Sequence, residues 1–119
     1  MDIDLGGNTL INGYFAGIVI TPGAHGRWVV KSTAYTAVAG DKIQADTTAV
    51  PFTITLPSTA SSGDKIFIQD AKLYWNTNNL TIAGNGLLIN GLSSNYIASV
   101  QGNKLSVVYV STSYGWSIK

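Results

Sequence analysis

Residues 40–57 read GDKIQADTTAVPFTITLP, and this stretch decides the fold class. Gly40-Asp41 is a turn signal, and residues 42–46 follow it with apolar side chains at alternate positions. Residues 52–56 alternate large apolar side chains with threonine, and Pro57 ends the run. Alternation with a period of two is typical of a β-strand with one buried face. The stretch therefore predicts two short strands joined by a loop.

The composition of the whole chain favours strands in the same way. All six acidic residues are aspartates, and the 119 residues include thirteen glycines, one methionine, no glutamate and no cysteine. Helices favour long unbranched side chains, whereas strands favour β-branched and aromatic ones, and turns favour glycine and asparagine. Turn signals recur about every 8 to 12 residues. We therefore predict an all-β fold, an antiparallel β-sandwich or small barrel-like domain of short strands.

Two tetrapeptides recur along the chain. GDKI occurs at residues 40–43 and 63–66, and LING occurs at residues 10–13 and 88–91. β-Turns select the same residue types repeatedly, so turn chemistry explains these recurrences better than an internal duplication does. In both copies of GDKI we expect the aspartate side chain to accept hydrogen bonds from the backbone amides that follow it.

The chain changes character after residue 31. Residues 1–31 carry closely spaced glycine turns and an apolar run at residues 14–20, whereas residues 32–119 have an even strand rhythm. We predict an N-terminal β-hairpin or arm over residues 1–31 that attaches to a larger particle, and a β module over residues 32–119. No signal peptide is expected from the acidic start. The candidate attachment residues are Ile3, Leu5, Leu10, Ile11, Tyr14 and Phe15.

Charged groups suggest no reactive centre. Seven basic and six acidic residues lie singly along the chain, which predicts no nucleic-acid partner. No apolar run approaches the length of about 18 residues that a membrane helix needs. His25 is the only histidine, and the aspartates are too scattered to complete a metal site or an acid–base pair around it. We predict no metal, no cofactor and no enzymatic activity.

Residues 74–79 form the candidate ligand site. Tyr74, Trp75, Asn76 and Asn78 combine rings that stack on sugars with amide groups that bind hydroxyls. The alternative is that the rings fill the core and the asparagines make turns, because large aromatic side chains are mostly buried. The sequence leaves both interpretations open.

The order of motifs from residue 33 onward resembles a known group of proteins. The motifs are YTA (35–37), AGDKI (39–43), DTT (46–48), PFTITLP (51–57), GDKI (63–66), NNLTI (78–82) and the closing GW (115–116). They resemble a small β module of structural proteins of tailed bacteriophages, notably the ends of tail fibres. The resemblance implies a virion protein that assembles as a homotrimer, and in some members a tip that binds host surface glycans.

The length of the chain favours one of two roles within that group, capsid decoration over a tail-fibre or baseplate tip. The chain has no long shaft before the module, so we predict a trimeric capsid decoration protein, made in the host bacterial cytoplasm. The alternative is a tail-fibre or baseplate tip domain that binds host surface glycans. From other classes, a carbohydrate-binding module would show glycan affinity at Tyr74 and Trp75, and an enzyme is disfavoured by the missing acid–base groups. Only 11 % of residues are charged, which also favours a surface covered by partners.

Overall fold

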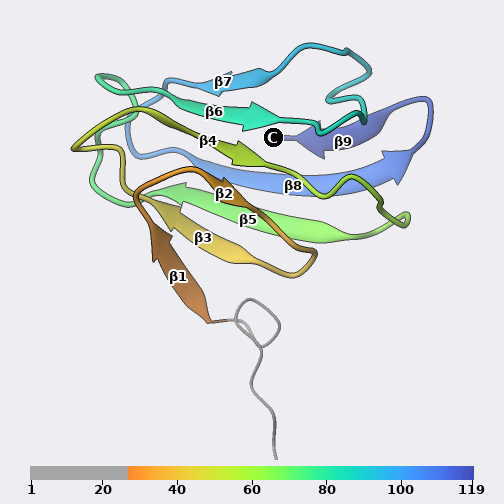
Figure 1. The fold of residues 1–119 in the computed structure, drawn as a ribbon, viewed down its shortest axis with the longest axis horizontal. Coiled ribbons are helices and arrows are strands. Elements are labelled where there is room, and N and C mark those ends of the chain that lie inside the picture. The colour runs from red at the N-terminus through yellow and green to blue at the C-terminus, as the bar shows by residue number, and fades with distance from the viewer. Residues whose placement is uncertain (1–26) are drawn as a thin grey trace, which may run out of the picture.

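This computed structural model describes residues 27–119, which form strands joined by turns and loops (Figure 1). These residues contain no helix, and so none that could cross a membrane. The all-β prediction is confirmed. The strands are β1 (Trp28–Lys31), β2 (Tyr35–Thr36), β3 (Lys42–Ala45), β4 (Phe52–Thr55), β5 (Lys65–Asp70), β6 (Leu80–Ala83), β7 (Tyr96–Ala98), β8 (Lys104–Ser111) and β9 (Gly115–Ile118).

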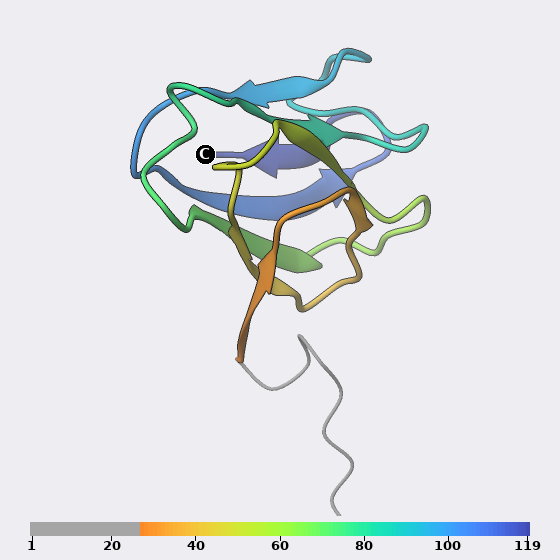
Figure 2. The ribbon, with the colours of Figure 1, turned by 60° about the vertical axis from the view of Figure 1, so that its left-hand side comes forward.

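The strands form two sheets, as Figures 1 and 2 show from two directions. The two sheets enclose one hydrophobic core. One sheet has five strands in the order β1-β3-β5-β8-β9, and the other has four in the order β2-β4-β6-β7. From β1 to β6, successive strands alternate between the sheets. This two-sheet arrangement agrees with the predicted sandwich.

The pairing differs from the antiparallel pattern that the sequence predicts. β1, β3 and β5 are parallel to one another, and so are β2, β4 and β6. Only β7, β8 and β9 add to the sheets in antiparallel fashion. The reason lies in the turns, which join strands of opposite sheets rather than neighbours within one sheet. Each time the chain comes back to the same sheet, the new strand runs parallel to the previous one. From β1 to β6 the chain therefore winds as stacked coils.

The β module begins earlier than the sequence predicts. Strand β1, which falls in the expected N-terminal segment, pairs with β3 over its whole length, from Trp28 opposite Lys42 to Lys31 opposite Ala45. The backbone N–H of Asp46 also donates to the carbonyl of Lys31 at 2.8 Å. Residues 28–31 therefore belong to the module, and the boundary placed at residue 31 is wrong. The rest of the expected segment, residues 1–26, lies outside the described residues.

The core fills the space between the sheets. In register, Ile43 pairs with Ile68, and Ile54 pairs with Ile82, so alternate positions of neighbouring strands meet inside. Full burial of such a side chain contributes about 1.5–3 kcal/mol. Trp75 and Trp116 are the largest fully buried side chains. The other wholly buried apolar side chains include Ile43, Ile54, Leu56, Ile66, Ile68, Leu80, Ile82, Leu105 and Val107.

The two GDKI copies share one turn geometry. Gly40 has φ 94° and Gly63 has φ 95°, values that an L side chain rarely adopts and that the third position of a type II turn requires. The carboxylates of Asp41 and Asp64 each accept from the backbone N–H three residues earlier, at 2.9 Å in both turns. The prediction that they bind following amides is wrong. The shared geometry explains the repeated letters.

Two asparagine–glycine turns lie between β6 and β7, and the second lies beside β9, the edge strand of the five-stranded sheet. Asn85 and Asn90 both have positive φ, as do the glycines that follow them. The segment around Asn90 runs along β9, where the N–H of Trp116 donates to the carbonyl of Leu88 at 2.8 Å. Gly115 has to be glycine here, because a Cβ at this position would overlap the Leu88 carbonyl.

Candidate functional site

The described acidic side chains all hold backbone together. Asp70 is buried, and its carboxylate accepts from the N–H groups of Tyr74 and Trp75 at 3.1 Å, of Gly102 at 3.0 Å and of Lys72 at 3.4 Å. Burial alone would raise the pKa of Asp70, but these four hydrogen bonds outweigh it and lower the pKa below its ordinary value. Asp70 therefore stays charged and ties two loops to each other.

Tyr35 and Asp41 form a second structural pair. The Tyr35 hydroxyl donates to Asp41 at 2.8 Å. Burial, followed by this hydrogen bond and the nearby negative charge, raises the pKa of Tyr35 to about 12. The phenol therefore remains protonated at neutral pH and acts as a donor. Among residues 27–119 no group of three or more metal-ligating side chains comes together, and His25 lies outside this range.

In the predicted glycan site at residues 74–79, the ring of Trp75 does not reach the surface. Trp75 is 0 % exposed, and its Nε1 donates to the Ala45 carbonyl at 3.3 Å. The Asn78 side chain donates to the Thr47 carbonyl at 2.8 Å, and Tyr74 is only half-exposed. Of the four predicted residues, only Asn76 is exposed. A sugar cannot stack on Trp75, so this part of the site prediction is wrong, and the alternative of core ring and turn-forming asparagine describes the loop.

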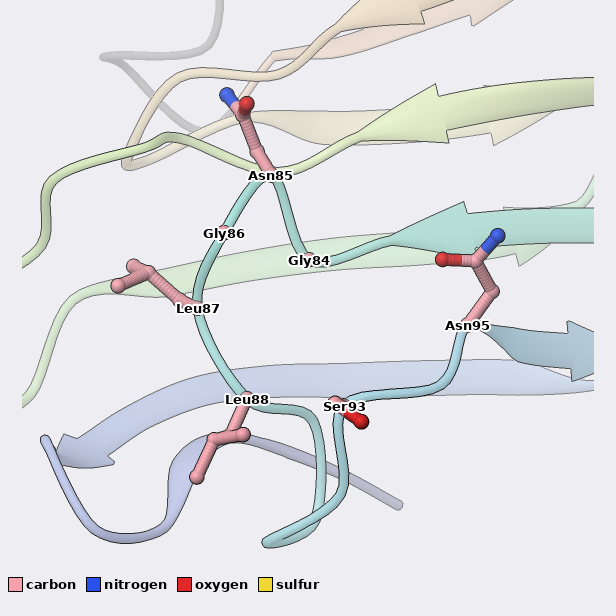
Figure 3. Close-up of a pocket in the computed structure, with 7 residues that line it drawn as sticks. All are labelled: Gly84, Asn85, Gly86, Leu87, Leu88, Ser93 and Asn95. Carbon is pink, nitrogen blue, oxygen red and sulfur yellow. The ribbon is translucent and has the colours of Figure 1, made fainter.

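A shallow pocket of about 160 Å³ lies beside the Asn85 turn (Figure 3). Its lining consists of Gly84, Asn85, Gly86, Leu87, Leu88, Ser93 and Asn95. Figure 3 shows the Asn85 side chain pointing away from Leu88, and its amide donates to the Leu56 carbonyl at 3.1 Å. The pocket has no charged lining residue and is smaller than the roughly 300–1,000 Å³ of ordinary ligand sites. Its size and lining therefore do not favour a substrate-binding site.

The outer face of the five-stranded sheet gathers lysines from distant parts of the sequence. Strand alternation and register place Lys42, Lys65 and Lys104 on this face, and no outward position of the five strands is acidic. We call it the lysine face. Its outward residues include Trp28, Val30, Lys42, Gln44, Lys65, Phe67, Gln69, Lys104, Ser106, Val108, Val110 and Ser117.

A row of alternating ring and cation crosses this face. Trp28, Lys42 and Phe67 are register partners on β1, β3 and β5. The Lys42 Nζ lies 5.8 Å from the centroid of each ring, which is within the range of a cation–π contact. In the next row Gln44 stands opposite Gln69. The face thus combines cations, aromatic surface and amides on one sheet.

The outer face of the four-stranded sheet has the opposite character. Strands β2, β4, β6 and β7 contain no charged residue. Thr53 stands opposite Thr81, which stands opposite Ile97, and Ile97 is 51 % exposed. We call this the threonine face, and its residues are Thr36, Thr53, Thr55, Thr81, Ala83 and Ile97.

Comparison with models of known protein families and with curated protein sequences gives no match. The candidate attachment residues Ile3, Leu5, Leu10, Ile11, Tyr14 and Phe15 all lie outside the described residues. The sequence alone identifies neither the lysine face nor the threonine face. Strand alternation does indicate that Lys42 and Lys65 point outward, but only the register shows that they share one face.

Proposed function

We propose that this chain is a non-enzymatic structural protein of a tailed-bacteriophage particle, a homotrimer that decorates the capsid. The order of motifs over residues 33–119 supports the phage setting. The observation that carries the self-association is the threonine face, an uncharged sheet surface with a large exposed apolar side chain, Ile97.

The threonine face is better suited than the lysine face to contact between copies of this chain. Depletion of charged residues marks the centre of protein interfaces, and an interface of standard size buries about 800 Å² per partner. The threonine face has that uncharged character over four strands. The lysine face would set like charges against each other, which is unfavourable. Trimer contacts therefore use the threonine face, and the lysine face stays outside.

Sedimentation equilibrium of the full chain tests the trimer. At micromolar concentration we expect a mass three times the chain mass of 12.5 kDa. Thr81→Lys, in the middle of the threonine face, should shift the mass toward that of one chain, because it would bury an unpaired charge at the contact. Thr112→Lys, in the exposed turn after β8, is the matched control and should remain trimeric. A wild-type chain that sediments as a monomer would contradict the proposal.

Deletion of residues 1–13 tests the attachment role. The paired strands begin at Trp28, so the shortened chain should keep its melting temperature in a thermal scan. It should no longer bind to particles stripped of the wild-type protein, because the predicted attachment residues Ile3, Leu5, Leu10 and Ile11 are lost. Undiminished binding of the shortened chain would place the attachment surface within the β module instead.

A tail-fibre or baseplate tip that binds host surface glycans is the second candidate. The lysine face favours it, because this surface offers Trp28 at 40 % exposure beside cations and amides.

A further inference from the structure

We propose that the lysine face binds an acidic polysaccharide, a sugar chain whose carboxylates are separated by neutral units. The biological setting of this binding rests on the second candidate function, since it names the class of glycan. The contact itself requires only the β domain.

Charge is distributed unevenly between the faces and the turns. Residues 27–119 hold seven basic residues against four aspartates. Asp41 and Asp70 are buried, and the carboxylates of Asp46 and Asp64 accept hydrogen bonds from backbone N–H groups of their own turns. The aspartate carboxylates thus accept hydrogen bonds from the backbone of the loops. Lys65 and Lys104, by contrast, are exposed on one sheet. A surface with one sign of charge steers ligands of the opposite sign toward it.

The spacing of the lysines fits a sparsely charged chain. Lys65 lies one strand over and two residues back from Lys42, on the order of 8 Å away from strand dimensions. Lys104 lies one strand over and four residues along from Lys65, on the order of 14 Å away. A nucleic acid carries a charge at every nucleotide and is often met by arginine, but no arginine occupies an outward position of these strands.

The positions between the lysines suit sugar units. Trp28 presents part of its ring, and Phe67, two strands away in the same row, is half-exposed. Such rings offer an apolar surface on which the face of a sugar can rest. The adjacent amides of Gln44 and Gln69 can both donate to and accept from hydroxyl groups. A row of side chains across three strands also offers an extended surface to a sugar chain without a deep pocket.

Calorimetric titration with defined polymers tests this assignment. The probe is hyaluronate, in which every second sugar carries a carboxylate, with neutral dextran and oligothymidylate as comparisons. The wild-type chain should bind hyaluronate in low salt, bind oligothymidylate more weakly and leave dextran unbound. The double variant K65Q/K104Q should bind hyaluronate about tenfold more weakly, because two exposed ion-pair partners are removed. K72Q, an exposed lysine in the loop after β5, is the control and should change affinity less than about twofold.

Three outcomes would overturn the proposal: no binding of hyaluronate by the wild type, an equal loss in K72Q, or tighter binding of oligothymidylate than of hyaluronate. The sedimentation mass of K65Q/K104Q separates this result from the proposed trimer. The double variant should keep the wild-type mass, because its substitutions lie on the lysine face. Loss of polysaccharide binding with an unchanged mass would thus concern the lysine face alone.

Discussion

Trp75→Ala should lower the free energy of unfolding by about 3–5 kcal/mol, because it removes the largest kind of side chain from a fully buried position. The indole also donates to the Ala45 carbonyl, and alanine leaves that acceptor without its partner. A domain of this size has a total stability of about 5–15 kcal/mol, so the variant should be close to unfolding. Urea denaturation followed by circular dichroism measures the change.

Trp28→Ala is the matched control for the loss of an indole. Trp28 lies on the edge strand β1 and is 40 % exposed, so its removal should cost less than about 1.5 kcal/mol. If Trp75→Ala kept wild-type stability, the ring would not be a core residue. The reinterpretation of residues 74–79 as a structural loop would then be refuted.

Asp70→Asn should lower the free energy of unfolding by about 2–4 kcal/mol. An asparagine has one oxygen acceptor, and its NH2 group would face N–H donors that now point at a carboxylate. Asp64→Asn is the control, because Asp64 accepts from Ser61 alone at a half-buried turn, and an amide oxygen can replace that contact. Its cost should stay below about 1 kcal/mol.

The same carboxylate makes stability depend on pH. Because the pKa of Asp70 is lower in the folded chain than in the unfolded chain, its contribution is fully present above the ordinary aspartate pKa of about 3.9. The contribution is lost as the pH falls through the lowered, folded-state pKa. Wild-type stability in urea should therefore drop with acidification below about pH 4, and Asp70→Asn should flatten that drop. An unchanged pH profile in the variant would show that other groups cause the acid sensitivity.

Much of the fold follows from local sequence. The alternation in residues 52–56 predicts β4 with its inward Phe52 and Ile54, and the glycines of both GDKI copies mark turns. Parallel pairing could not be predicted in this way, because a turn sequence does not reveal whether the next strand joins the same sheet or the opposite one. The antiparallel expectation failed at those crossings.

The interaction surfaces depend on the same long-range information. Lys42 and Lys104 are far apart in sequence, and only the order β3-β5-β8 places them on one face. Trp75 precedes the asparagine-rich residues 76–79, and the sequence alone leaves both a buried and an exposed ring open. Its burial depends on the Asp70 carboxylate, which holds the Trp75 N–H and turns this segment inward. An aspartate at the end of an apolar strand was the available signal for this arrangement.

Electron cryo-microscopy of a phage particle that carries this chain tests the central claim most directly. We predict density for three copies around a three-fold axis on the capsid surface, with the threonine faces in contact and the lysine faces outward. Density at the tail, single separate copies on the capsid, or absence of the chain from the particle would contradict the account.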